Sequence, residues 1–272
     1  MNNVKEENGV EPQGARGLEI EPRDNPMKKA QINMRAPLPK RFYKETSVAR
    51  DEAGLYRVLL DGKPLRTPTK NLLALPSEAA AILVAEEFDA QKKEIDPSTM
   101  PVTRIVNSAI DGVSADVDGV VADLVRFSET DLLCYRAEGP DGLAVAQAKA
   151  WQPVLDWAAK ALGAKLLVVE GIMHVAQPRE TIAAIAAEIN SLRDPFLLSC
   201  VHVMTTLTGS VMLGLAVANG RLSADEAFEA AHVDEDWNIR LWGEDAEAAE
   251  RRAYKKGEML AAARLYEALP GR

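Results

Sequence analysis

A long segment without Lys, Arg, Asp or Glu constrains the fold more than any other feature of this sequence. It runs from Pro195 to Gly220, and a membrane-spanning helix needs about 20 predominantly apolar residues. Polar side chains interrupt the segment at several places, which is unlike a membrane helix and typical of a buried one. We therefore predict a buried core helix and no membrane insertion. The interrupting side chains are Ser199, His202, Thr205, Thr206, Thr208, Ser210 and Asn219.

The part of the chain from residue 37 to residue 138 combines strand and helix patterns. Asp61-Gly62 is a typical turn of a β-hairpin. Pro76-Ser77-Glu78 predicts the start of a helix, because proline is tolerated in the first helical turn. The expected strands are 41–44, 55–60, 63–66, 72–75 and 131–135, and the expected helices are 76–93, 101–109 and 114–127.

The breaker Gly139-Pro140-Asp141-Gly142 precedes a mostly helical remainder. Ser223 and Glu226 form a capping-box pattern at the start of one of its helices. Helices are expected at 143–162, 178–192, 223–242 and 245–269, with a short strand at 166–169. The predicted fold class is α+β. A small α+β domain at 37–138, with β-hairpins and helix, precedes a larger, mostly α-helical domain at 139–270.

Residues 1–36 are polar and rich in Glu, Asn, Pro and Gly, which predicts a disordered tail. A mitochondrial transit peptide would be rich in Arg and poor in acids, so the acids of this segment argue against one. No apolar stretch follows the first Met, which argues against secretion.

Acidic residues outnumber basic ones by 41 to 32, which gives a net charge of −9. Nucleic acids and anionic membranes attract basic surfaces, so we expect neither as a partner. The two cysteines and three histidines lack the spacing of a local zinc site. No glycine-rich phosphate loop or G-x-S-x-G nucleophile motif occurs. We therefore expect no metal and no cofactor.

Acids and tryptophans are concentrated between Asp234 and Asp245, a segment with five acids and two of the four tryptophans. On a helix, Asp236 and Arg240 would form an ion pair, whereas Glu235 has no basic residue three or four positions further on. The Glu235 carboxylate is then free for another contact. A solvent-facing acidic helix, an anchor surface for a protein partner and an acid–base site all fit this composition.

The segment 86–103 leads from a helix into a loop that contains Pro97 and Pro101. Each proline fixes its own backbone and disfavours helix in the residue before it. A preformed recognition loop and a loop packed on the core both fit this pattern.

Four sequence blocks, in this order, resemble the assembly chaperone family specific for the α subunit of F-type ATP synthase. The resemblance covers about residues 40–250. Members often carry Trp at the position of Phe88 and Tyr-Gln at the position of Trp237-Asn238, so this chain departs from the pattern there. The blocks are Arg41–Lys44 with Leu59–Pro68; Glu87–Gln91 with Ile95–Pro97 and Met100–Thr103; Thr130–Tyr135 with Gln147 and Trp151–Pro153; and Glu235–Ile239 with Trp242-Gly243.

The resemblance implies a two-part fold, no enzymatic activity, no catalytic residue and no small-molecule substrate. It implies transient binding of the free ATP synthase α subunit until the β subunit replaces the chaperone, and it places a functionally important acid at Glu235. The alternatives are a non-catalytic scaffold for another partner and an acid–base enzyme centred on Glu235. We expect a bacterial cytoplasmic protein rather than one of the mitochondrial matrix. The partner-binding candidates are Glu235, Asp236, Trp237, Trp242, Glu244 and Phe88.

Overall fold

The computed structural model describes residues 37–271, so the tail predicted at 1–36 lies outside the described residues. The first four strands are antiparallel, and β2 pairs with the other three. Asp61 and Gly62 have φ angles of 49° and 75°, as a two-residue hairpin turn requires. The expected hairpin and the strands at 55–60, 63–66 and 72–75 are confirmed, although the last two are short. The strands are β1 Thr46–Arg50, β2 Tyr56–Leu60, β3 Lys63–Pro64 and β4 Ala74–Leu75.

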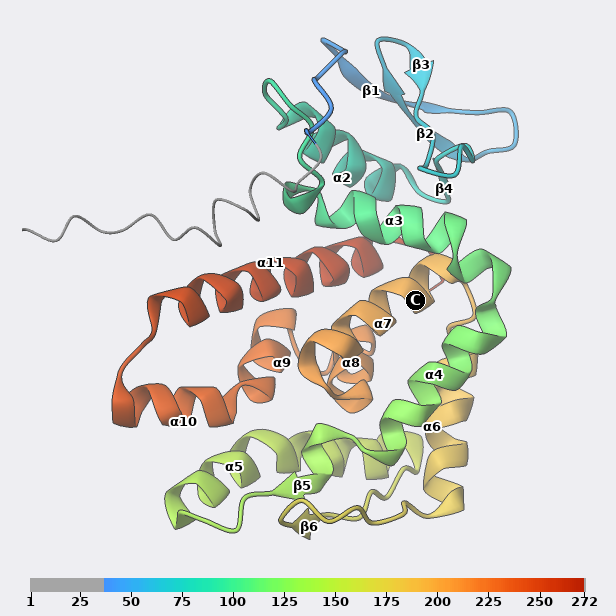
Figure 1. Ribbon diagram of the computed structural model, residues 1–272. Coiled ribbons are helices and arrows are strands. Elements are labelled where there is room, and N and C mark those ends of the chain that lie inside the picture. The colour runs from blue at the N-terminus through green and yellow to red at the C-terminus, as the bar shows by residue number, and fades with distance from the viewer. Residues whose placement is uncertain (1–36, 272) are drawn as a thin grey trace, which may run out of the picture. The chain divides into compact units, whose positions relative to one another are not determined.

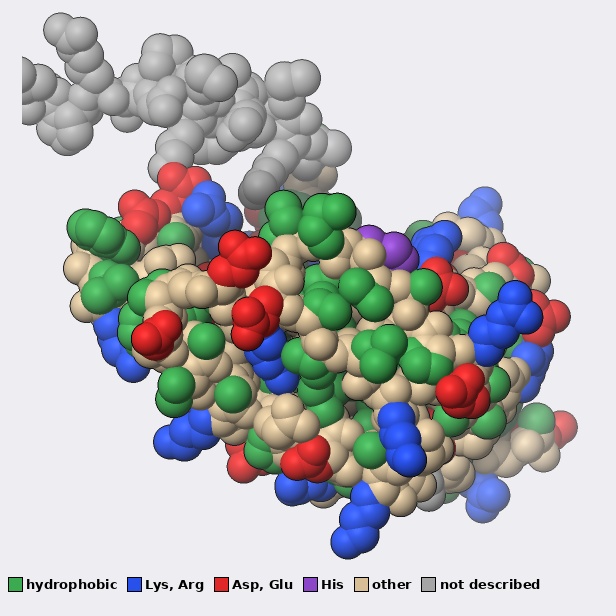
Figure 2. Space-filling model, turned by 90° about the horizontal axis from the view of Figure 1, so that it is seen from below, with side chains coloured by type: hydrophobic (Ala, Val, Ile, Leu, Met, Phe, Trp, Pro, Cys, Tyr) green, Lys and Arg blue, Asp and Glu red, His purple; other side chains and the backbone are tan. Residues whose placement is uncertain are grey.

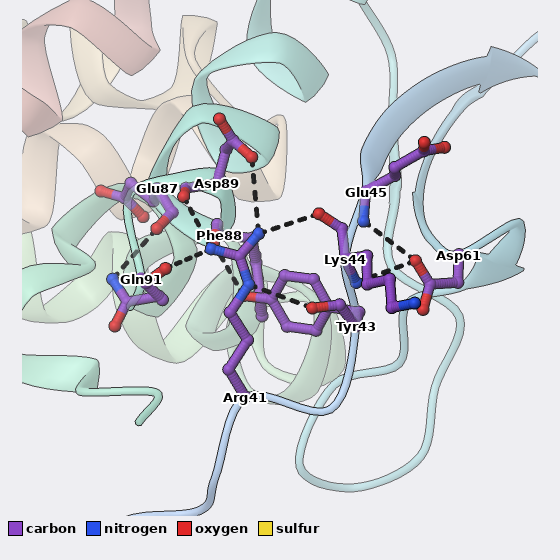
Figure 3. Close-up of polar contacts among 9 residues, drawn as sticks. All are labelled: Arg41, Tyr43, Lys44, Glu45, Asp61, Glu87, Phe88, Asp89 and Gln91. Atoms are coloured by element: carbon purple, nitrogen blue, oxygen red, sulfur yellow. Dashed lines mark hydrogen bonds and ion pairs between the residues drawn. The ribbon is translucent and has the colours of Figure 1, made fainter. Parts of the chain in front are cut away.

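The strand predicted at 41–44 is wrong, and β1 begins at Thr46 instead. The segment is bound to the end of helix α2 (Glu78–Asp89) by side chains rather than by a strand ladder (Figure 3). The Arg41 guanidinium donates to the backbone oxygens of Tyr43 and Asp89 at 3.1 and 3.0 Å. The Tyr43 hydroxyl donates to the backbone oxygen of Phe88 at 2.7 Å. The contacts with Asp89 and Phe88 link residues more than 40 positions apart, so local sequence does not reveal them.

Helix α2 covers strands β1 and β2, and helices α3 (Pro101–Asp111) and α4 (Val117–Glu129) follow it (Figure 1). Ser77 caps α2 by accepting a hydrogen bond from the Ala80 N–H. The residue before α3 provides no side-chain cap, and Glu87 of α2 supplies one. The Glu87 carboxylate accepts 2.7 Å hydrogen bonds from the N–H groups of Val102 and Thr103. One side chain thus joins the ends of two helices.

The strand predicted at 131–135 is mostly a 3₁₀ turn, Leu132–Cys134, with β5 confined to Tyr135–Arg136. Asp131 causes the turn, because its buried carboxylate accepts a hydrogen bond from the Leu133 N–H at 3.0 Å. β5 pairs in parallel with β6, Val169–Glu170. Of the strand predicted at 166–169, only the last residue, Val169, belongs to β6. The Gln177 side chain binds both backbone groups of Leu167 instead.

Seven helices of the remaining described chain confirm its predicted helical character. Helix α7 lies among α3, α4, α8 and α11 (Figure 1). The buried helix expected at 195–220 is confirmed as core, yet it consists of two helices rather than one. Gly209, with a φ of 68°, ends α7, and the Ser210 hydroxyl caps α8. The helices are α5 Asp141–Trp157, α6 Arg179–Ser191, α7 Pro195–Thr208, α8 Val211–Ala218, α9 Ala224–Ala231, α10 Val233–Trp242 and α11 Ala246–Ala268.

The single helix predicted at 223–242 is also interrupted, at His232. The His232 ring stacks on Phe228 with centroids 4.0 Å apart, and its Nδ1 lies 2.7 Å from the backbone oxygen of Phe228. The backbone N–H of His232 donates to the backbone oxygen of Glu229, three residues earlier, rather than to a residue four positions earlier as in an α-helix. This tighter turn ends α9. The predicted capping box of Ser223 and Glu226 is confirmed at the start of α9.

One buried cluster extends from the β2 side chains to the last turns of α11, so the strand-containing and helical parts share a core. The α+β fold class is confirmed, whereas the domain boundary near Gly139 stays a prediction. Across residues 37–271, no helix combines the length and the apolar character that crossing a bilayer requires.

Candidate functional site

Helix α10 carries the acidic segment on the surface, and none of its residues is buried. Two side chains fasten it to α5. The Trp237 indole packs on Gly142, where a Cβ would lie 2.4 Å from the ring atom Cη2. The Asp234 carboxylate accepts a 2.7 Å hydrogen bond from the Gln147 amide. These two contacts fix which side of α10 faces the solvent.

The ion pair predicted between Asp236 and Arg240 is wrong. The Asp236 carboxylate pairs with Arg252 of α11 at 2.5 Å, and this bond, together with the nearby acids, raises the pKa of Arg252. Arg240 lies over the Trp237 ring, 5.0 Å from its centroid, and donates to the backbone oxygen of Asp236. Asp236 therefore ties α10 to α11 rather than stabilising α10 alone.

Helices α10 and α11 and the turn between them enclose a pocket of about 340 Å³. Ile239, Trp242 and Ala249 are among the apolar residues that line it. The Trp242 side chain is 84% exposed, and Leu241 beside it is 56% exposed. Large apolar side chains at this exposure mark a surface suited to binding a protein.

Charged residues of both signs surround this pocket: Glu235, Glu244, Asp245, Arg251, Arg252 and Lys255. The Glu235 carboxylate is 57% exposed, and its nearest ionic partner is His232, with Nε2 3.9 Å away. It forms no ion pair with Lys or Arg in the described part of the chain.

The six partner-binding candidates separate into three groups. Glu235, Trp242 and Glu244 line the pocket. Asp236 and Trp237 fix the position of α10, through the ion pair with Arg252 of α11 and the contact with Gly142 of α5. Phe88 lies in the core instead, 7% exposed and edge-to-face with Tyr43 at 5.9 Å. Burial against Tyr43 makes its side chain a packing element of α2 rather than a surface anchor.

The proline-bounded loop at 95–100 is held to the protein on both sides of residues 97–99, which are themselves exposed. Gln91 is buried and donates to Thr99 at 3.1 Å while it accepts from the Asp96 N–H at 2.8 Å. Met100 is buried as well. These contacts favour the packed-loop interpretation over the recognition-loop interpretation.

The basic residues of α11 were not among the predicted candidates. Arg251, Arg252 and Lys255 recur at helical spacing, so they were readable as one face of a helix. The sequence gives no sign that this face turns toward α10, because that depends on the turn at Gly243, which has a φ of 87°.

Apolar side chains are also exposed elsewhere, for example at Ile172 and Met173 after β6. Figure 2 views the side on which α5 and β6 lie in Figure 1, and shows apolar side chains interleaved with acids and bases. The α10–α11 pocket combines a concave apolar lining with two acids, Glu235 and Glu244, that form no ion pair with Lys or Arg in the described part of the chain.

Comparisons with known proteins find one family and several solved structures. The family described as "ATP12 chaperone protein" matches residues 40–159. The Atu1473 protein of Agrobacterium tumefaciens, a candidate chaperone, is 51% identical with a TM-score of 0.83, covering 92% of each chain. Atp12 from Paracoccus denitrificans is 42% identical with a TM-score of 0.78, covering 84% of this chain and 97% of that one. A point variant of the Paracoccus protein is 41% identical with a TM-score of 0.79, covering 86% and 98%.

Proposed function

The chain belongs to the ATP12 chaperone family, and from this premise we propose that it binds the free α subunit of ATP synthase during assembly of the F1 sector. The chaperone covers a surface of α that would otherwise self-associate, and it leaves when the β subunit arrives. It performs no catalysis, and it works in the cytoplasm of a bacterium.

The α10–α11 pocket is the observation that carries this proposal. Glu235, the acid that the resemblance singles out, faces this pocket beside the exposed Trp242. An aromatic residue next to an unpaired charge is typical of the residues that dominate binding at protein interfaces. A reversible contact of moderate area is what a chaperone that must be displaced requires.

The geometry around Glu235 supports binding rather than acid–base chemistry. A general base needs a proton donor within about 2.6–3.2 Å, usually in a site that excludes water. The Glu235 carboxylate is more than half exposed, and the His232 ring is 3.9 Å away. A scaffold for an unrelated partner would share this surface, but the likeness to named chaperones favours the assembly role.

Affinity capture tests the proposal. The tagged protein is expressed in its own cell, and the captured proteins are identified by mass spectrometry. Recovery of the ATP synthase α subunit, depleted of β, is the expected result. Capture of α only together with an equal amount of β would show that the protein binds assembled F1, and this would contradict the proposal.

A further inference from the structure

Only some of the charged residues around the α10–α11 pocket form ion pairs with Lys, Arg, Asp or Glu. Arg251 pairs with Glu247 at 2.9 Å, and Arg252 pairs with Asp236. Asp245 uses its carboxylate to cap α11 at the Ala248 N–H.

Within residues 37–271, three lining charges form no ion pair with Lys, Arg, Asp or Glu: Glu235, Glu244 and Lys255. Glu235 and Glu244 are close enough to Arg252 to raise its pKa, but that guanidinium is already bonded to Asp236. Arg251 and Arg252 are neutralised by Glu247 and Asp236, so the lining charges outside these pairs include more carboxylates than ammonium groups and carry a net negative charge.

The pocket is small and partly apolar. A volume of about 340 Å³ is at the lower end of the range for ligand sites, about 300–1,000 Å³. It accommodates one or two side chains of a partner rather than a whole helix. Ile239 and Ala249 form apolar lining, and the exposed Trp242 adds an aromatic wall that an incoming aliphatic side chain would cover.

Resting on the proposed function, we propose that this pocket recognises a segment of the partner in which a large aliphatic side chain stands next to Lys or Arg. The aliphatic side chain enters the pocket against Trp242 and Ile239. The basic residue meets Glu235 and Glu244 at the rim. Burial of the aliphatic group excludes water from the rim, which strengthens the charge contact.

Short peptides test this chemistry without the α subunit. The probe is acetyl-Gly-Leu-Arg-Leu-Gly-amide, and the matched controls replace Arg by Glu or both Leu residues by Ser. Binding is followed by the indole N–H signal of Trp242 in ¹⁵N-labelled full-length protein, assigned with Trp242→Phe. The Arg-Leu probe should shift this signal saturably and bind about tenfold more tightly than either control. Equal binding of the three peptides, or no shift of the Trp242 signal by the probe, would overturn the proposal.

Charge variants provide a second arm with opposite expected signs. The double variant Glu235→Gln/Glu244→Gln should weaken binding of the probe about tenfold. Lys255→Gln should strengthen binding about two- to threefold, because it removes a like charge from the rim. If Lys255→Gln weakens binding of the probe, the pocket is not selective for a base.

An apolar variant separates shape from charge. Ala249→Trp fills the pocket without changing any charge and should abolish the Trp242 shift, while Glu250→Gln, an exposed change outside the lining, should leave it intact. Circular dichroism verifies that each variant is folded. A failure of the peptide assay contradicts the pocket chemistry alone, whereas a wild-type protein that does not bind α contradicts the proposed function and leaves the peptide result standing.

Discussion

The indole of Trp237 lies so close to Gly142 that a Cβ at Gly142 would be 2.4 Å from its ring. This contact makes glycine necessary at a helical position, where glycine ordinarily costs stability. It also sets the position of α10, and with it the direction of the exposed acids and of Trp242.

Gly142→Ala should therefore destabilise the protein by about 1–3 kcal/mol, because the added methyl group collides with the indole. Gly257→Ala is the matched control, since nothing lies within 4 Å of a Cβ at that helical position. It should stabilise the protein by about 0.5–1 kcal/mol. Urea unfolding measures both changes. Two variants that gain stability equally would show that the contact with Trp237 does not constrain α10.

Glu87 should contribute to stability through the cap that it provides for α3. Its carboxylate is partly buried, and desolvation raises its pKa against the hydrogen bonds from Thr103 and Val102. Glu87→Ala leaves the α3 N–H groups without these acceptors and should cost about 1–3 kcal/mol in urea unfolding.

Glu86→Ala is the control, because this neighbour on the same helix is exposed and has only a 3.8 Å contact with Arg264. Its unfolding free energy should change by less than about 0.5 kcal/mol. Equal losses at Glu86 and Glu87 would indicate a general effect of acids on α2 rather than the cap.

Asp131 should make stability depend on pH. Burial raises the pKa of its carboxyl from 3.8 to about 6, despite hydrogen bonds from the N–H groups of Met212 and Leu133. Between these two pKa values the folded protein retains a proton that the unfolded chain has released. The contribution of Asp131 therefore declines as the pH rises through this window, by an amount on the order of 2 kcal/mol.

The measurement compares wild type with Asp131→Asn at pH 4.5 and pH 7. The asparagine does not titrate, so the difference in unfolding free energy between the two proteins isolates this group. Wild type should lose stability relative to Asp131→Asn between pH 4.5 and pH 7. A difference that stays constant, or moves the other way, would contradict the raised pKa.

The features that sequence predicted well are those set by neighbouring residues. The Asp61-Gly62 turn needs only two residues with positive φ, and the Ser223 cap needs only Glu226. The break between α7 and α8 was equally local, since Gly209 followed by Ser210 is a helix end followed by a cap. The uniform lack of charge from Pro195 to Gly220 nevertheless predicts a single helix there.

The features that sequence did not predict depend on contacts between distant residues. Arg41 does not lie in a strand, because its side chain donates to the backbone oxygen of Asp89 at the end of α2. Asp236 bonds to Arg252 on the next helix instead of Arg240 on its own. The resemblance indicates Glu235 and Trp242, but only the placement of α11 beside α10 shows that both residues line one pocket.

Binding of the purified ATP synthase α subunit, measured as Kd for wild type, Glu235→Lys and Glu250→Lys, tests the central claim most directly. Both variants make the same charge change at an exposed acid, and only Glu235 lines the pocket. We predict that wild type and Glu250→Lys bind α with similar Kd values and that Glu235→Lys binds about tenfold or more weakly. A folded Glu235→Lys protein that binds α as tightly as Glu250→Lys would contradict the account.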